Sequence, residues 1–365
     1  MNLPPFDFDP HLPSARTLPS TYYIDPSVLE VERDTVFSHS WQLAGRRDQV
    51  VTPGSYFTTA IGREPLLVVH GHDGTIRALS NVCRHRAGPV AEGAGTRARF
   101  RCGYHGWSYS SNGCLLQAPE FAGVEEFELD KVRLPEFRLE IWNDLLFVNL
   151  SAGGPSLTEA LGDLPSRMSS NFSGYKLAAR KEWDIECNWK VYVDNYLEGY
   201  HIPIVHPSLM RELDYANYKT ETARFFSIQH SPIRNPDRLR TADGTSAEAQ
   251  YFWLFPNLML NVYPDNFSTN LIVPLSAGRT RTVFEWFFAD GSARDGQVDE
   301  TVAFSDEIQI EDIQICEAVQ RGLRSSTYST GRYSVARENG VHHFHGLLNE
   351  FLAGHRKAGR PTPSS

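Results

Sequence analysis

The sequence predicts an α+β chain in two parts, the first of them all-β. Three observations predict this fold class. Residues 41–150 contain short strand-like runs separated by turns rich in Gly, Asn and Asp. The Gly-Gly-Pro stretch at 151–155 has the composition of a linker. Beyond it, strand-like runs over 249–289 precede a long helical pattern at 298–324, so we expect an antiparallel sheet with flanking helices.

The helices are predicted from caps, breakers and periodicity. After a proline-rich start, the segment 1–40 predicts a short helix with Asp25 or Ser27 as its cap, and we expect it to pack on the second part. Residues 188–200 predict a helix that ends near Pro203, because proline disrupts a helix interior.

The long helix shows an apolar stripe at approximate helical spacing, formed by Ile308, Ile315, Ala318, Val319 and Leu323. The tail that follows the last helix is rich in Gly, Pro and Ser and is expected to be flexible. The predicted domains are 1–40, 41–150 and 155–357, followed by the tail at 358–365.

Composition excludes several classes of protein. The chain of 365 residues carries a net charge of −9, which argues against nucleic acid or anionic lipid as its main partner. Its apolar runs are far shorter than a membrane span. The first twenty residues lack the apolar stretch of a secretory signal, so we expect a cytoplasmic protein. Five cysteines, an odd number, make a disulfide framework unexpected there.

The strongest motif pairs two cysteines with two histidines. Cys83 and His85 are separated by one residue, Cys102 and His105 by two, and 16 residues lie between the pairs. Two unrelated Cys/His pairs on surface loops would rarely show these fixed offsets. A structural zinc site is one interpretation, since two thiolates and two imidazoles suit tetrahedral Zn²⁺. The alternation of Cys and His within each pair favours a Rieske [2Fe–2S] cluster instead, in which imidazoles replace two thiolates on one iron.

Neighbouring residues fit the cluster interpretation. Gly103 and Gly106 allow the backbone to approach the sulfides closely, and Pro89 can make the loop that carries Cys83 rigid. Of the remaining cysteines, Cys114, Cys187 and Cys316 have no partner at ligand spacing and are expected to be small buried residues.

A second constellation lies near the predicted helix at 188–200. His201 and His206 are five residues apart, and Glu198 precedes His201 by three, so the two share a helix face. Taken alone, this pattern also fits histidines hydrogen-bonded within a core. Pro203 and Pro207 break the helix and can turn His206 back toward the same metal.

Two imidazoles and one carboxylate form the facial triad of non-haem Fe(II) oxygenases. The carboxylate must then come from elsewhere in the chain, and the long helix offers four candidates: Asp306, Glu307, Glu311 and Asp312. For any one of these acids, the ordinary alternative is a solvated helix face.

The motifs together resemble the Rieske non-haem iron oxygenases. The segments Asn81-Val82-Cys83-Arg84-His85-Arg86 and Cys102-Gly103-Tyr104-His105-Gly106-Trp107 look like that family's two cluster loops. The resemblance extends from about Tyr22 to Leu352. It implies an all-β Rieske domain followed by a helix-grip-like catalytic domain with an antiparallel sheet and flanking helices.

The resemblance also assigns site residues and cofactors. Cys83, His85, Cys102 and His105 would hold the [2Fe–2S] cluster, while His201, His206 and Asp312 would hold a mononuclear Fe(II). Asp312 is selected because Ile310-Glu311-Asp312-Ile313-Gln314 resembles the segment that carries the family's aspartate ligand, and Glu311 is its nearest rival.

Glu198 would link the iron site to the Rieske cluster of a neighbouring subunit, with Asp194 as the fallback. Such a contact implies a head-to-tail ring, most often a trimer. The family further implies O₂ as co-substrate and a separate reductase chain that passes on electrons from NAD(P)H.

Within the family, several segments are nearest to choline monooxygenase and related quaternary-amine oxygenases. One of them is the stretch from Ile310 to Leu323, and another is Phe255-Pro256-Asn257-Leu258-Met259-Leu260-Asn261. The implied activity is hydroxylation of a small quaternary ammonium or N-methylated compound, such as choline or a betaine. An aromatic-ring hydroxylase or O-demethylase on the same scaffold is the alternative.

Aromatic side chains are expected to form the wall of the substrate pocket, because a quaternary ammonium is bound by aromatic faces. The candidates in the second sheet are Tyr251, Phe252, Trp253, Phe255, Tyr263, Phe267, Phe284, Trp286 and Phe287. By strand alternation, about half of them should be ordinary core.

Two other classes of protein remain as alternatives to an oxygenase. The length of the chain argues against a pure electron carrier, which needs only the first domain. Metal analysis would exclude a zinc-binding module.

Overall fold

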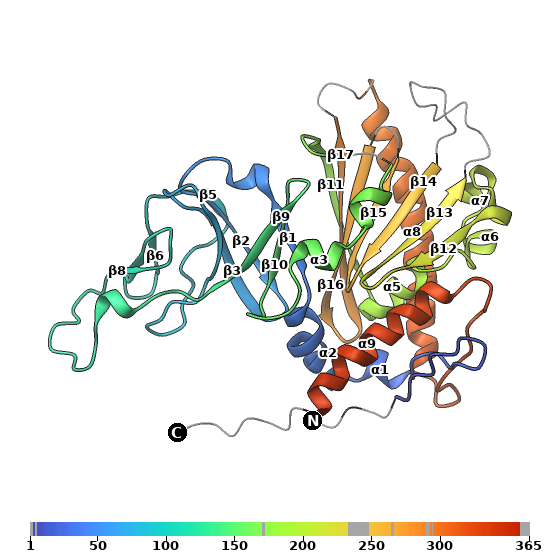
Figure 1. Cartoon of the computed structure of the whole chain (residues 1–365), viewed down its shortest axis with the longest axis horizontal. Helices are drawn as coiled ribbons and strands as arrows, with labels where there is room; N and C mark the ends of the chain where they lie inside the picture. The colour runs from blue at the N-terminus through green and yellow to red at the C-terminus, as the bar shows by residue number, and fades with distance from the viewer. Residues whose placement is uncertain are drawn as a thin grey trace. The chain divides into compact units, whose positions relative to one another are not determined.

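The computed structural model describes residue 3 and residues 6–169, 172–232, 248–263, 266–289, 293 and 295–357. The tail at 358–365, predicted to be flexible, lies outside the described residues. The chain forms two compact units, one spanning Phe37–Leu157 and the other combining Met1–Val36 with Thr158–Ser365 (Figure 1). Within the described ranges, no helix is both long enough and apolar enough to cross a membrane.

The unit Phe37–Leu157 is built from β-strands. In its described residues, seven antiparallel strands pair in the order β1-β10-β9-β4-β3-β2-β5, and a small sheet pairs in the order β6-β7-β8. The large sheet comprises β1 (Gln42–Arg46), β2 (Ser55–Ile61), β3 (Glu64–His70), β4 (Ile76–Ser80), β5 (Ala94–Thr96), β9 (Glu136–Trp142) and β10 (Leu145–Asn149). The small sheet comprises β6 (Phe100–Arg101), β7 (Ser108–Tyr109) and β8 (Leu115–Gln117). Short helical turns occur at η2 (Arg47–Val50) and η3 (Leu129–Lys131).

Strand β3 shows why this unit has two hydrophobic clusters. Its consecutive apolar residues are all buried, and successive side chains of a strand point to opposite faces. Leu66 and Val68 enter one cluster, whereas Leu67 and Val69 enter the other. The second cluster also contains Cys83 and Cys102, so the sheet core continues directly into the cysteine loops.

The other unit is organised around a second antiparallel sheet. Its seven described strands pair in the order β11-β17-β16-β15-β14-β13-β12 (Figure 1). They are β11 (Lys176–Ile185), β12 (Lys219–Thr222), β13 (Phe226–Pro232), β14 (Glu248–Leu254), β15 (Leu258–Val262), β16 (Asn266–Ser276) and β17 (Arg279–Phe288). The predicted fold class, an all-β domain plus an antiparallel sheet with helices, is therefore confirmed.

The helices occupy both ends of the chain and the segments between strands. They are α1 (Thr21–Ile24), α2 (Pro26–Glu32), η1 (Arg33–Phe37), α3 (Leu157–Leu161), α4 (Leu164–Arg167), α5 (Trp189–Tyr196), α6 (Ile202–Val205), α7 (Pro207–Glu212), η4 (Tyr215–Asn217), α8 (Gln297–Leu323) and α9 (Asn339–Lys357). Of the two predicted caps, Asp25 is the N-cap of α2, and its side chain accepts a hydrogen bond from the backbone N–H of Ser27.

Helix α5 begins where the sequence predicts and ends earlier than predicted. The Asn188 side chain caps it by accepting a hydrogen bond from the backbone N–H of Lys190. The helix stops at Tyr196, four residues short of the predicted end, and Leu197 leaves the helical path. The residues from Glu198 to His201 therefore form a turn rather than a helical face.

Helix α8 buries part of the predicted apolar stripe, including Leu323, together with polar residues outside that stripe. Val319 is 44% exposed, whereas the polar residues Gln309 and Gln320 are each 1% exposed. Gln309 donates a hydrogen bond to Thr282 Oγ1 of β17, and Gln320 accepts one from the backbone N–H of Asn188. The two glutamines have interior partners, so hydrophobicity alone does not identify the packed face.

Helix α5 is anchored by a buried ion pair. Lys190 and Glu32 are both fully buried, and Lys190 Nζ lies 2.7 Å from Glu32 Oε1. The indole N–H of Trp189 donates to the other oxygen of Glu32 at 2.8 Å. Burial lowers the pKa of Lys190 and raises that of Glu32, because desolvation disfavours both charged forms.

Candidate functional site

Two loops present the Cys/His pairs at one end of the β-strand unit. Cys83 and His85 lie between β4 and β5, and Cys102 and His105 lie between β6 and β7. Each loop is closed by backbone hydrogen bonds, from the Cys83 N–H to Gly88 and from the Cys102 N–H to Trp107. Both cysteines are therefore held on tight turns at the edge of the core.

The four side chains pair by ligand type and not by loop: the two cysteines lie together, and the two histidines lie together. Burial raises the pKa of the Cys102 thiol, and the neighbouring Cys83 thiol adds to that effect. The rings of His85 and His105 lie 4.6 Å apart between centroids. A thiol pair beside an imidazole pair is the donor set of a Rieske cluster, in which each iron takes two ligands of one kind.

Two further observations fit a cluster at these residues. The Nδ1 atom of His85 is buried without a hydrogen-bond partner among the described residues, which a metal bond would satisfy. At Gly88, a Cβ would lie only 3.1 Å from Cys102 Sγ, so the absence of a side chain leaves room beside the sulfur. The residues present thus suit a [2Fe–2S] group.

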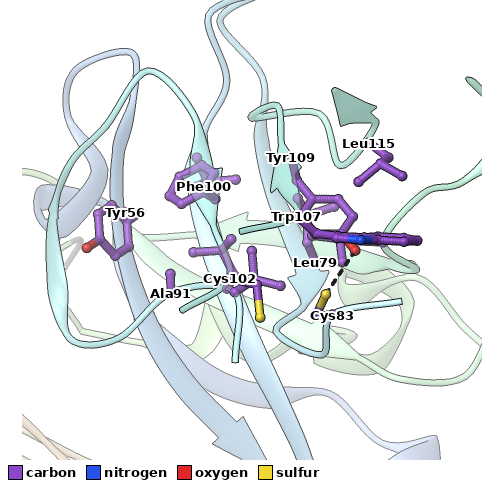
Figure 2. Packing of buried hydrophobic residues seen from close by; sticks show 13 residues of the cluster. Tyr56, Leu79, Cys83, Ala91, Phe100, Cys102, Trp107, Tyr109 and Leu115 are labelled. Carbon is purple, nitrogen blue, oxygen red and sulfur yellow. Dashed lines mark hydrogen bonds between the residues drawn. The ribbon is translucent and has the colours of Figure 1, made fainter. Parts of the chain in front are cut away.

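Two aromatic residues to which the sequence assigned no role, Trp107 and Tyr109, support the two loops. The Tyr109 hydroxyl lies 3.3 Å from Cys83 Sγ (Figure 2). The same hydroxyl accepts a hydrogen bond from the Arg84 N–H. The Trp107 indole stacks on His85 with a 7° angle between planes. Trp107 lies in the second loop and Tyr109 in β7, and their contacts with the first loop are not visible in the sequence.

A second group of ligand-type residues lies in the other unit. His201, His206 and Asp312 each offer one ligand atom, and these atoms all lie within 4.8 Å of one another. Asp312 Oδ1 is 3.0 Å from His206 Nε2 and 3.8 Å from His201 Nε2. Two imidazoles and one carboxylate around one point suit a non-haem iron.

Helix breaks bring the two histidines together. After α5 ends, His201 is the N-cap residue of the short helix α6, and His206 lies between α6 and α7. Pro203 and Pro207 occupy the first turns of these helices, where a missing N–H is tolerated. Gly199 is required in the turn, because a Cβ there would lie 2.7 Å from the Tyr218 ring.

Asn195 was not predicted and contacts the acid directly. Its side-chain amide on α5 donates a hydrogen bond to Asp312 Oδ1 at 2.6 Å. The contact joins residues 117 positions apart, so only the packing of α5 against α8 reveals it.

Glu198 lies beside His201, as its sequence spacing suggests. Its Oε1 atom is 2.6 Å from His201 Nδ1, and its other oxygen accepts hydrogen bonds from the backbone N–H groups of Tyr200 and His201. The carboxylate is thereby fixed by its own turn and holds the ring of His201.

Glu311, the rival for Asp312, lies on the far side of His206. Its Oε2 atom is 2.7 Å from His206 Nδ1, the nitrogen that faces away from Asp312. Burial lowers the pKa of His206, but the adjacent carboxylates of Asp312 and Glu311 outweigh it and leave the pKa raised.

Asp194, the fallback for Glu198, belongs to a separate buried network. It accepts hydrogen bonds from the Tyr23 hydroxyl at 2.6 Å and contacts His345 Nε2 at 3.0 Å. His345 is 1% exposed and its other nitrogen meets the Tyr333 hydroxyl. These contacts hold the N-terminal segment and α9 against α5.

A cavity of about 430 Å³ contains the His201, His206 and Asp312 side chains. A row of paired residues crosses four strands on its wall: Tyr251 of β14, Asn261 of β15, Ser268 of β16 and Trp286 of β17. Its aromatic lining comprises Tyr192, Tyr196, Tyr218, Tyr251, Tyr263, Phe284, Trp286 and Phe304.

About half of the nine aromatic candidates line the cavity, as expected, but strand alternation does not explain the division, because Tyr251 and Trp253 share a face of β14 and only Tyr251 lines the cavity. Four of them line the cavity, namely Tyr251, Tyr263, Phe284 and Trp286. The other five are buried in the core, namely Phe252, Trp253, Phe255, Phe267 and Phe287. The aromatic residues contributed by α5 and α8 were missed, because the prediction considered only the sheet.

Comparison with known proteins decides the family. The Rieske [2Fe–2S] domain matches residues 40–128, and the catalytic domain of the ring hydroxylating alpha subunit matches residues 172–354. This chain belongs to the Rieske ring-hydroxylating oxygenases. It is the oxygenase component of such an enzyme, with a Rieske cluster and a mononuclear iron as cofactors. Enzymes of this family use O₂, a substrate and a reductase partner.

Named relatives of this Rieske oxygenase act on quaternary amines. Chloroplastic choline monooxygenase of Arabidopsis thaliana is 36% identical, over 95% of this chain and 86% of the relative. The carnitine monooxygenase oxygenase subunit of Escherichia coli K12 is 30% identical, over 94% and 96%. The predicted likeness to choline monooxygenase is confirmed.

Solved structures agree with the fold. The quaternary ammonium Rieske monooxygenase CntA in complex with L-carnitine matches with a TM-score of 0.83 and 26% identity, over 96% of this chain and 100% of that one. Naphthalene 1,2-dioxygenase from Rhodococcus matches with a TM-score of 0.76 at 20% identity, which supports the fold alone.

Proposed function

We propose that this oxygenase hydroxylates a small quaternary ammonium or N-methylated compound, such as choline or a betaine. The observation that carries the proposal is the charge and aromatic character of the cavity beside His201 and His206. Every charged group lining it within the described residues is a carboxylate: Glu198, Glu300 and Asp312. Tyrosine, phenylalanine and tryptophan rings line the same cavity.

A permanent cation suits this lining for physical reasons. A quaternary ammonium has no N–H to donate, so it is held by aromatic faces and by nearby negative charge. Burial raises the pKa of Tyr196 and Tyr251 well above the usual range, so these rings stay neutral phenols. A carboxylated aromatic substrate would instead need a guanidinium or ammonium group, which the described lining lacks.

We assign the two cofactors to the residues described above. Cys83, His85, Cys102 and His105 hold the Rieske cluster, and His201, His206 and Asp312 hold the iron. The support is the paired thiols and imidazoles in one unit and the close approach of three ligand atoms in the other. The iron, when bound, supplies the O₂ chemistry, and the side chains around it orient the substrate and exclude water.

The proposed reaction balances as a monooxygenation. One oxygen atom of O₂ enters a C–H bond of the substrate as a hydroxyl group, and the other leaves as water. Two electrons from the reductase and two protons complete the equation. Hydroxylation of an N-methyl group yields a hemiaminal that releases formaldehyde, whereas hydroxylation of the alcohol carbon of choline yields a hydrated aldehyde.

We further propose that Glu198 carries electrons between subunits. Its support is the contact of its carboxylate with His201 Nδ1, which leads directly to the iron site. A structure of the quaternary ammonium relative is described as revealing inter-subunit electron transfer. A closed head-to-tail ring, such as a trimer, would satisfy this contact in every subunit. The cytoplasmic location stays a prediction from the sequence.

Substrate-dependent O₂ uptake tests the proposed function. Iron-loaded protein with a surrogate reductase and NADH is offered choline, glycine betaine, carnitine, stachydrine and several aromatic acids. We expect O₂ consumption coupled to a hydroxylated or demethylated quaternary amine, identified by mass spectrometry. Turnover restricted to the aromatic acids would overturn the substrate class and leave the metal assignments standing.

A further inference from the structure

Each of the two site histidines has a carboxylate on both of its ring nitrogens. The Nε2 atoms of His201 and His206 both face Asp312 Oδ1. On the opposite side, the Nδ1 atom of His201 contacts Glu198, and the Nδ1 atom of His206 contacts Glu311. Glu198 and Glu311 thus occupy equivalent positions relative to the proposed iron.

We infer that Glu311 is a positioning residue that holds His206 for iron binding, and that it is not itself a ligand. This inference rests on the iron site proposed above. The contact between Glu311 Oε2 and His206 Nδ1 is 2.7 Å, which is a charge-assisted hydrogen bond. It places the ring proton on Nδ1 and leaves the lone pair of Nε2 directed toward Asp312.

The helix geometry explains how two consecutive acids take different roles. Neighbouring residues on an α-helix point about 100° apart, because one turn contains 3.6 residues. Asp312 therefore reaches the Nε2 side of His206, while Glu311 reaches the Nδ1 side of the same ring. A Glu311 carboxylate that is bonded to Nδ1 is separated from the iron by the imidazole.

The two positioning contacts are not redundant. Glu198 is fixed by the backbone N–H groups of its own turn, so its contact with His201 is local. The contact of Glu311 joins residues 105 positions apart and ties α8 to the turn between α6 and α7. The His206 side chain is only 2% exposed, so water does not readily replace a lost partner.

Removal of Glu311 should therefore weaken iron binding without disturbing the Rieske cluster. Loss of a partner that orients a metal-binding histidine typically lowers metal affinity about 10–100-fold. Glu311→Ala should show this loss, and Glu311→Gln should lose less, because its amide oxygen still accepts from Nδ1–H. Glu307→Gln is the matched control: Glu307 lies one turn earlier on α8 and bonds Ser208 rather than a histidine.

The experiment measures Fe(II) affinity by chelator competition on protein whose Rieske absorption is intact. Co(II) placed in the iron site adds a visible spectrum that reports ligand geometry, which a merely structural change elsewhere would not shift. We expect the affinity order wild type and Glu307→Gln, then Glu311→Gln, then Glu311→Ala, with the Co(II) spectrum changed in the Glu311 variants. If Glu311→Ala fails to fold, the isosteric Glu311→Gln decides.

Three results would overturn the inference in distinguishable ways. Wild-type affinity and spectrum in Glu311→Ala and Glu311→Gln would remove the positioning role. Complete loss of metal in Glu311→Ala with retention in Asp312→Ala would make Glu311 the ligand. Unchanged binding in Asp312→Ala, His206→Ala and Glu311→Ala together would place the iron elsewhere and refute the proposed site itself.

Discussion

The buried ion pair between Lys190 and Glu32 gives the sharpest prediction about the fold. Both side chains are fully buried, and the other oxygen of Glu32 accepts a hydrogen bond from the indole of Trp189. Lys190→Met leaves the Glu32 carboxylate in the core without its cation. Losing one partner of a buried pair destabilises a protein by about 3–5 kcal/mol. At about 2–4 °C per kcal/mol for a unit of this size, the midpoint should fall by roughly 6–20 °C.

The double variant Lys190→Met with Glu32→Gln should recover much of that loss. Desolvation already shifts the pKa of each partner toward its neutral form, so the charged pair itself contributes little net stability. Thermal unfolding of the full chain measures this, with tryptophan fluorescence and bleaching of the Rieske absorption separating the two units. Lys181→Met is the control, because Lys181 pairs with Asp306 at the surface and is 44% exposed.

A midpoint that changes no more in Lys190→Met than in Lys181→Met would show that the buried pair does not anchor α5. A double variant as unstable as Lys190→Met alone would show that the loss of stability does not come from an uncompensated Glu32 charge. Either result would mean that α5, which carries Asn195 and leads to Glu198, is anchored by other contacts.

The remaining predictions concern the two metal sites. His85→Ala should abolish the visible Rieske absorption while mononuclear iron stays bound, as metal analysis would report; retained absorption would contradict the cluster assignment. Asp312→Ala should keep the cluster, lose the mononuclear iron and lose turnover, and normal iron content would point to another carboxylate. At saturating Fe(II), Glu198→Gln should retain both metals but slow oxidation of the reduced cluster by at least about 10-fold in single-turnover measurements. Unchanged oxidation would place the electron route elsewhere.

The sequence predicts best what depends on local spacing. The ligands of each cluster loop lie within four residues of one another, so their pattern survives without knowledge of the fold. Glu198 and His201 share a turn for the same reason, although the turn is not the helical face that the spacing suggested. Strand alternation gave the proportion of pocket aromatics correctly but not their identity, because Tyr251 and Trp253 share a strand face and only Tyr251 lines the cavity.

Contacts between distant elements could not be predicted. Asn195 meets Asp312 and Glu311 meets His206 only after α5, α7 and α8 pack together. On α8, Gln309 and Gln320 are buried because they find hydrogen-bond partners, whereas the apolar Val319 stays exposed. A hydrophobic pattern carries no information about such partners, which explains why the predicted stripe missed these two buried glutamines.

The most direct test of the account compares choline with 3,3-dimethyl-1-butanol, in which carbon replaces the charged nitrogen. The two have nearly the same shape, so the cavity of aromatic faces and carboxylates distinguishes them by charge alone. A desolvated cation–π contact of about 2 kcal/mol corresponds to roughly a 30-fold difference in kcat/KM. We predict coupled hydroxylation of choline with at least about a 10-fold preference over the neutral compound. Equal kcat/KM for the two compounds, or no coupled turnover of any quaternary amine, would contradict the account.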